Sequence, residues 1–186
     1  MKSARSKIIG VLLMASSMLG INPAHATTQT FSCGGGGSYT VVNGVFTVDS
    51  RHHCSGALVL DASVTTLEYA TYLPNVTSLT IPATTVNIST QNTFIARSLI
   101  TEYIVDGNNP NYKSVDGVLY SKNGTKLFSY PQSNAGLSFT IPADVTEITD
   151  GAFHALNVLQ TVNITETATL SGQPFNSCCN GNTGNT

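Results

Sequence analysis

Apolar residues recur along this chain at a spacing that fits neither a helix nor a strand. In the clearest copy the apolar positions are Val145, Ile148, Phe153, Leu159, Val162 and Ile164. Neither the helical period of 3.6 nor the strand period of 2 accounts for the whole run. A coil of strand, turn and short helical turn does, because each coil turns a few side chains inward and stacks on the next coil. The spacing therefore predicts a stack of coils.

Two further copies lie upstream. The first contains Val64, Leu67, Tyr72, Val76, Leu79 and Ile81, and the second contains Phe94, Ile100, Tyr103 and Val105. Strand-like triplets begin at residues 58, 79, 103, 139 and 162, so successive steps are 21, 24, 36 and 23 residues. Three of these steps lie in the range of roughly 20–29 residues that is typical of leucine-rich repeats. The long third step indicates an insertion.

The insertion is predicted to be a β-hairpin over residues 115–130. Asn123-Gly124 separates two strand-like runs. Because Asn-Gly accepts positive φ values, it favours a two-residue type I′ turn. The predicted cross-strand pairs are Tyr120 with Leu127 and Leu119 with Phe128. Asp116-Gly117 is interpreted as a turn that enters this hairpin.

Two segments carry a resemblance to a known family. The run from Asn109 to Leu127, together with Thr140 to Phe153, resembles the BspA type of leucine-rich repeat of bacterial surface and secreted proteins. The resemblance covers about Gly56 to Thr165 and is strongest from Ile100 onward, since earlier copies lack the Ala-Phe pair. It implies a mainly β repeat solenoid with small helical turns. It also implies adhesion-like contacts with host, matrix or bacterial surface proteins.

The N-terminus has the pattern of a secretory signal peptide. Lys2, Arg5 and Lys7 precede an apolar run over residues 8–19, and Ala24-His-Ala26 follows as a cleavage site. The apolar run is too short to span a membrane. We expect cleavage after Ala26, a secreted or extracytoplasmic location at the cell surface or in the periplasm, and no membrane insertion of the mature chain.

The composition excludes some classes of partner. Charged residues make up 10% of the chain and the net charge is −2, whereas about 25% charged residues is usual. Binding to nucleic acid needs a stripe of basic residues, and binding to an anionic membrane needs a basic cluster. The sequence contains neither. We therefore expect a protein ligand and no nucleic acid.

Four cysteines in an exported chain predict disulfides. We favour Cys33 with Cys54, because a second Asn-Gly hairpin over residues 39–48 could bring the ends of the intervening segment together. Cys178 and Cys179 are adjacent, so they either form a strained vicinal disulfide or pair elsewhere.

The chain divides into four predicted regions. They are a signal peptide over residues 1–26, a disulfide-closed hairpin cap over 27–55, repeats over 56–165 with the inserted hairpin, and an irregular Cys-containing tail over 166–186. Within the repeats, residues 150–156 predict a single helical turn with Asp150 as N-cap and Phe153 turned inward.

The sequence favours structural roles over metal-binding or catalytic ones for its histidines and cysteines. His52-His53-Cys54 contains soft-metal ligands, but a site needs three or four, and Cys33 is the obvious further candidate. We prefer a disulfide with two solvated histidines. The chain lacks the G-x-S-x-G, H-E-x-x-H and phosphate-loop motifs. We therefore expect no enzyme, no cofactor and no metal.

The remaining ionisable residues have ordinary structural interpretations. Asp144, Glu147 and Asp150 lie in a predicted connecting segment, where they suit turn and cap chemistry. His154 is expected on the exposed outer turn rather than as a general base.

Strand alternation predicts one candidate binding face. When the apolar residues of each triplet point inward, the middle residues point outward; these are Val59, Thr80, Ile104, Thr140 and Asn163. Stacked coils would place them in a flat, uncharged row, and solenoids bind partners on such faces. The first functional hypothesis is a protein-recognition module that uses this row. The alternative is a structural spacer whose face binds nothing specific.

Overall fold

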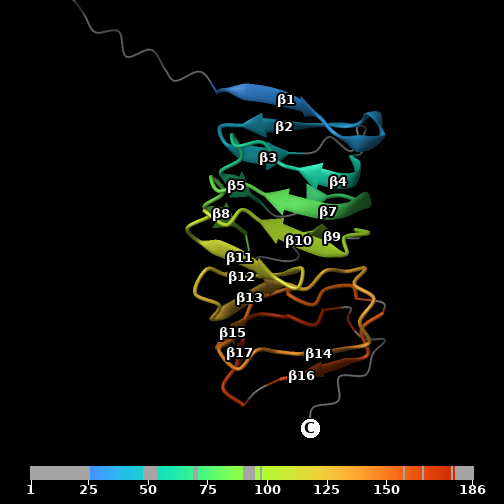
Figure 1. Ribbon diagram of the computed structural model, residues 1–186, viewed down its shortest axis with the longest axis vertical. Helices are drawn as coiled ribbons and strands as arrows, with labels where there is room; N and C mark the ends of the chain where they lie inside the picture. Colours follow the sequence, from blue (N-terminus) through green and yellow to red (C-terminus); the bar gives the residue numbers. More distant parts are fainter. Residues whose placement is uncertain are drawn as a thin grey trace, which may run out of the picture.

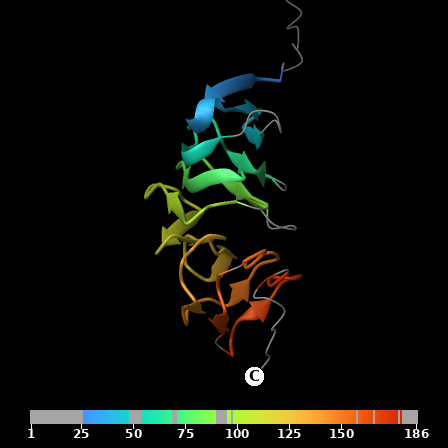
Figure 2. The same ribbon diagram turned by 90° about the vertical axis from the view of Figure 1, so that its right-hand side faces the viewer.

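The computed structural model describes residues 26–47, 54–68, 71–89, 95–96, 98–156, 158–164, 166–176 and 178. It forms a β-solenoid of about five turns in which the chain winds from β1 at one end to the C-terminal strands at the other (Figures 1 and 2). The described residues contain one short helix, the 3-10 helix η1 (Gly34–Gly36). The predicted mainly β repeat solenoid is confirmed.

Two sheets cover one side of the stack, on the left in Figure 1. The N-terminal one has the order β1 (Thr28–Ser32), β2 (Ser38–Val42), β3 (Val45–Thr47), β5 (Thr66–Leu67) and β8 (Asn87–Ile88). The C-terminal one has the order β11 (Tyr112–Val115), β12 (Val118–Ser121), β13 (Lys126–Ser129), β15 (Glu147–Ile148) and β17 (Thr169–Leu170). Hairpins form the antiparallel part of each sheet, and successive coils add the parallel strands.

Three smaller sheets complete the coils. The first has the order β10 (Glu102–Val105), β7 (Asn75–Ile81) and β4 (Ser55–Val59). The others are the parallel pairs β14 (Ser138–Thr140) with β16 (Thr161–Asn163) and β6 (Thr71–Tyr72) with β9 (Ile95–Ala96). Parallel pairing at intervals of one coil is the ladder that the repeat spacing requires.

Threonine hydroxyls reinforce this ladder at the corners of the coils. Each donates to a backbone carbonyl of the preceding coil, for example Thr85 Oγ1 to Val64 at 2.9 Å and Thr169 Oγ1 to Thr146 at 2.9 Å. Thr146 donates in turn to the carbonyl of Thr125 at 3.3 Å. A β-branched residue with a hydroxyl both suits a strand and satisfies a carbonyl, which explains the high threonine content of the repeats.

The interior is divided into two hydrophobic cores, and β12 separates them. Leu119 packs in the N-terminal core, whereas Val118 and Tyr120, its neighbours on the same strand, pack in the C-terminal core. All three side chains are buried. Because alternate residues of a strand point to opposite faces, a strand with a core on each side must be apolar throughout. The inserted hairpin is therefore a partition inside the solenoid.

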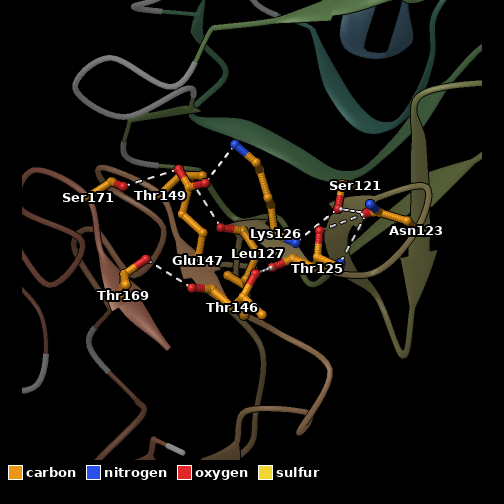
Figure 3. Close-up of polar contacts among 10 residues, drawn as sticks. All are labelled: Ser121, Asn123, Thr125, Lys126, Leu127, Thr146, Glu147, Thr149, Thr169 and Ser171. Atoms are coloured by element: carbon orange, nitrogen blue, oxygen red, sulfur yellow. Dashed lines mark hydrogen bonds and ion pairs between the residues drawn. The ribbon is translucent and has the colours of Figure 1, made fainter. Parts of the chain in front are cut away.

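The inserted hairpin differs from its prediction in two details. Tyr120 lies opposite Leu127, as expected, but a bulge between Leu119 and Tyr120 places Leu119 opposite Ser129 rather than Phe128. The connection spans residues 122–125 instead of two residues, with positive φ at Gly124 and not at Asn123. The Asn123 carboxamide explains the longer loop, because its Oδ1 atom accepts from the Thr125 amide and hydroxyl at 3.2 and 3.0 Å (Figure 3).

A two-residue turn closes the strand pair before it. Asp116 and Gly117 both have positive φ, at 49° and 77°, and join β11 to β12. These angles are typical of a type I′ hairpin turn. The inserted unit is therefore a three-stranded meander of β11, β12 and β13 rather than one hairpin.

The predicted helical turn near Phe153 is wrong. Residues 150–155 form successive turns in which the amides of Ala152 and His154 donate three residues back, and Ala155 has a φ of 54°. Asp150 lies at the start of this segment, and its Oδ1 atom accepts from the Gln173 amide of the following coil at 2.7 Å. The inward position of Phe153 is confirmed, since its side chain is fully buried.

The N-terminal cap has the predicted hairpin and cystine. Asn43 and Gly44, both with positive φ, close the hairpin of β2 and β3. Cys33 and Cys54 are bonded, with Cα atoms 5.3 Å apart. A side chain at Gly34 would meet the Ser55 carbonyl oxygen at 2.1 Å. Glycine there lets the two backbones come close enough for the cystine to tie the cap to β4.

Most predicted core positions of the repeats are buried, with one clear exception. Ile164, expected to point inward, is 43% exposed and follows β16, beyond which no further strand of that ladder lies among the described residues. The side chains of Tyr72 and Phe94 lie outside the described residues.

Candidate functional site

Three predicted face residues lie side by side on one parallel sheet. Thr80 of β7 is in register with Val59 of β4 on one side and with Ile104 of β10 on the other. Val59 is 67% exposed and Ile104 is 42% exposed, whereas Leu58, Leu79 and Tyr103 beside them are buried. We call Val59, Thr80 and Ile104 the strand face. It is an uncharged strip of β-branched side chains on backbone held by parallel hydrogen bonds.

The remaining two predicted residues do not continue this row. Thr140 and Asn163 lie in register on the separate pair of β14 and β16, where Asn163 Nδ2 donates to Thr140 Oγ1 at 3.1 Å. A single row of five residues would need β14 to pair with β10. The turn between β11 and β12 occupies that edge instead, since the Tyr103 amide donates to the Gly117 carbonyl at 2.8 Å. The predicted continuous row is therefore split in two.

The same turn adds an exposed residue that sequence reasoning missed. Val115 ends β11, is 47% exposed, and belongs to a strand that packs along β10. The Ser114 hydroxyl accepts from the Val105 amide at 3.1 Å, which fixes β11 against β10. Asp116-Gly117 between two strand-like runs was the available signal, and recognising it as a hairpin would have placed Val115 beside the strand face.

A cluster of polar side chains lies on the other side of the solenoid, over β13, β15 and β17, and Lys126 and Glu147 are the two ionisable residues drawn in it (Figure 3). Lys126 Nζ lies 2.6 Å from Glu147 Oε2, and the Ser171 hydroxyl donates to Glu147 Oε1 at 3.1 Å. The hydrogen bond from Lys126 lowers the pKa of the Glu147 carboxyl, against a smaller opposing effect of burial. A carboxylate held ionised by these donors is unsuited to general-acid catalysis at neutral pH. Glu147 lies on a strand rather than in a connecting segment.

A buried asparagine connects the N-terminal sheet, which ends at β8, to the C-terminal sheet, which begins at β11. Asn109 Nδ2 donates to the carbonyls of Pro82 and Thr85 at 2.8 and 2.9 Å, and its Oδ1 accepts from the amides of Asn111 and Tyr112, both at 2.9 Å. The carboxamide makes the hydrogen bonds that another parallel strand would have made. Its position is structural because every polar atom of this buried side chain is satisfied.

The candidate metal ligands do not converge in the described part of the chain. Cys54 is bonded to Cys33, so its sulfur is not a thiolate ligand, and His52 and His53 lie outside the described residues. No group of three His, Cys, Asp or Glu side chains able to hold a metal occurs among the residues that the structure covers. Cys178 is also disulfide-bonded, whereas Cys179 lies outside the described residues.

His154 sits at the corner turn beside Phe153. Burial lowers the pKa of its imidazole, and the nearby Asp150 carboxylate acts in the opposite direction. The side chain is partly buried rather than exposed, which differs from the prediction.

Among the residues that the structure describes, no helix is long and apolar enough to cross a membrane.

Similar folds occur among solved structures of bacterial proteins. A leucine-rich repeat protein from Eubacterium ventriosum superposes with a TM-score of 0.61 at 29% identity, over 66% of this chain and 33% of that one. The pneumococcal vaccine antigen PcpA gives a TM-score of 0.49 at 23% identity, over 67% and 29% of the two chains. A leucine-rich cell surface protein from Faecalibacterium prausnitzii gives 0.49 at 20% identity, over 64% and 38%.

The matched segment is a small part of those proteins. It spans between 29% and 38% of the length of each. Neither a scan of family models nor a search of curated proteins gave a match. The likeness to the Eubacterium protein, the 21- to 24-residue coils and the parallel ladders therefore carry the assignment of fold and repeat type.

Proposed function

Since this chain is a leucine-rich-repeat protein of the BspA-like type, we propose that it is an extracytoplasmic module that recognises a protein ligand through the strand face. The observation that carries the proposal is the in-register strip of Val59, Thr80 and Ile104. Two exposed aliphatic side chains flank a threonine there on a rigid parallel sheet. Apolar side chains fixed in an extended sheet lose little entropy on binding, so they suit recognition of a complementary surface.

The extracytoplasmic location is supported by two features. The cystine of Cys33 and Cys54 ties the cap to the first coil, and such bonds persist in oxidising compartments. The signal-peptide pattern ending at Ala26 predicts export to such a compartment. The ligand would be a host, matrix or bacterial surface protein. The strip carries no charge, so the affinity should change little with salt.

A binding screen tests this proposal. The exported chain is immobilised on a biosensor and exposed to purified extracellular-matrix and bacterial surface proteins. The key variant is Ile104→Arg, which puts a charge at one end of the strand face, next to Thr80. The matched control is Val86→Arg, because Val86 is 47% exposed and precedes β8 on the other side of the coil.

We expect saturable binding that Ile104→Arg weakens more than about tenfold and Val86→Arg leaves unchanged. Thr80→Arg should act like Ile104→Arg, since the two positions are neighbours in the sheet. Absence of any saturable ligand, with both variants folded, would contradict the recognition role and favour a structural spacer. Binding lost equally in the control would move the site away from the strand face.

A further inference from the structure

The first strand of the stack has an open edge. β1 is the terminal strand of its sheet, and among the described residues no strand pairs with its outer side (Figure 1). Four of its five residues are exposed, and Phe31 is partly buried. Its sequence, Thr-Gln-Thr-Phe-Ser, contains neither a charged residue nor a proline. Proteins usually protect such an edge with lysine, proline or a bulge, because unpaired backbone groups are a template for another strand.

The register shows which backbone groups are available on that edge. The Asn43 amide donates to the Thr27 carbonyl at 3.0 Å, and the Cys33 amide donates to the Gly37 carbonyl at 2.9 Å. Both bonds fit the antiparallel register of β1 with β2, in which bonded and non-bonded residues alternate. The odd-numbered residues therefore bond to β2. The residues that direct their amide and carbonyl groups outward are Thr28, Thr30 and Ser32.

Edges inside the stack are covered in a way that this edge is not. The Ile88 amide of β8 donates to the Tyr112 hydroxyl at 2.9 Å. The Tyr103 amide of β10 donates to the Gly117 carbonyl. At the opposite end of the solenoid, the terminal strands β16 and β17 have three and two residues, against five in β1. β1 thus presents a longer strand edge than either terminal strand at the opposite end of the stack.

We propose that β1 pairs with β1 of a second copy of this chain in an antiparallel dimer. With Thr30 opposite Thr30, Thr28 lies opposite Ser32 of the other copy. Each of these pairs exchanges two backbone hydrogen bonds, because every residue in them points its polar groups outward. The interface is the same patch on both copies, as two-fold symmetry requires.

The side chains of β1 are compatible with this self-pairing. The strand carries no charge, so no like charges oppose each other across the two-fold axis. Phe31 packs on the N-terminal core and stacks on Tyr39, with ring centroids 5.2 Å apart. In the proposed register it faces Gln29 of the second copy, which would cover its exposed part. Cleavage after Ala26, as the sequence predicts, leaves one residue before β1 and no longer segment to obstruct the edge.

Sedimentation of the exported protein over a range of concentrations, up to about 100 µM, tests the dimer. Thr30→Pro removes the central outward amide, a change that edge strands tolerate. Thr30→Lys and Thr30→Glu each place like charges opposite one another in a homodimer but opposite charges in a mixed dimer. Thr140→Lys is the matched control, because Thr140 is an exposed strand threonine remote from β1.

We expect the wild type to form a reversible dimer. Thr30→Pro, Thr30→Lys and Thr30→Glu should each raise its dissociation constant at least about tenfold. An equimolar mixture of the Thr30→Lys and Thr30→Glu proteins should dimerise as the wild type does. Thr140→Lys and Ile104→Arg should remain dimeric, so this result is independent of the strand-face proposal. A monomeric wild type would overturn the proposal, and so would a dimer unaffected at Thr30. If Thr30→Pro fails to fold, restoration by the mixed charges decides.

Discussion

The two halves of the solenoid follow one repeat spacing and have mainly aliphatic cores, but they arrange their aromatic rings differently. The N-terminal core is built mainly from leucine, isoleucine and valine, and a cystine anchors its cap. The C-terminal core is arranged around Phe153. The centroid of its ring lies 5.6 Å from that of Tyr130, 6.0 Å from that of Phe139 and 5.1 Å from that of Phe175. The repeat therefore specifies where a side chain points, whereas each core depends on its own set of side chains.

The difference also shows how each half closes its end. Aromatic packing supports the C-terminal half across several coils, because one ring contacts residues from three other segments, and Cys178 of this core is disulfide-bonded as well. The N-terminal cap is a short antiparallel sheet, and small sheets of this kind are marginal alone. A covalent link compensates by restricting the unfolded chain. Truncating the ring and removing the cystine should thus affect opposite ends of the molecule.

The largest effect is expected from Phe153→Ala. Replacing a buried phenylalanine with alanine leaves a cavity and should lower the free energy of unfolding by about 4 kcal/mol. Urea unfolding monitored by circular dichroism measures it. Phe153→Leu, which keeps more of the apolar volume, is the control and should lose clearly less. Equal losses in both variants would contradict a central role for ring packing.

Removal of the cystine should come next. The double substitution of Cys33 and Cys54 by alanine opens a link between residues 21 apart in sequence, which corresponds to a loss of about 3 kcal/mol. Hydrogen exchange should increase first in β1, β2 and β4, while β13 and β15 keep their protection. If hydrogen exchange became faster by the same factor along the whole chain, the cap and the C-terminal half would open together instead.

A smaller loss is expected at the joint between the halves. Asn109→Ala removes the hydrogen bonds that its carboxamide makes to the Thr85 carbonyl and the Tyr112 amide, both buried, and should cost about 2 kcal/mol. Asn108→Ala, at an exposed neighbouring position, should change stability by less than about 0.5 kcal/mol. Thermal unfolding of the two variants compares them. Similar melting temperatures would mean that water replaces the carboxamide at the joint.

The smallest effect is expected at the ion pair. The pKa of Glu147 is lower in the folded state, so the stability it contributes is present above its unfolded pKa and is lost as pH falls through the folded value. The pair is partly exposed and should contribute about 0.5 kcal/mol. Glu147→Gln should remove that contribution, so the free energy of unfolding, measured by urea unfolding at several pH values, should fall less steeply as the pH is lowered. The difference between variant and wild type should shrink at high salt.

Local signals predicted much of this fold. The spacing of Val145, Ile148 and Phe153 indicated inward positions that are buried. Asn43-Gly44 gave the cap hairpin, and that hairpin pointed to the pairing of Cys33 with Cys54. Each inference used residues close in sequence, where turn chemistry and strand alternation decide the geometry.

Some failures were local, such as the longer loop at Asn123, but others came from contacts between segments. The bulge at Leu119 depends on two cores competing for the faces of β12, and the split of the strand face depends on where the turn at Gly117 lies. Asn109 gave no sequence signal, because an asparagine in a turn-rich run is ordinary until its neighbours in space are known. Spacing placed Val59, Thr80 and Ile104 on one sheet but could not show that the row ends there.

The threonine ladder has a consequence for how such chains can lengthen. Each hydroxyl bonds to the coil before it, and the same kind of bond recurs at Thr85, Thr146 and Thr169. A duplicated coil of 21 to 24 residues would therefore bring its own connections to both neighbours. The meander is different, since β12 faces two distinct cores and could not be copied without a third. Adding a coil on either side of the partition thus extends an existing core, whereas adding a second partition would require a third core.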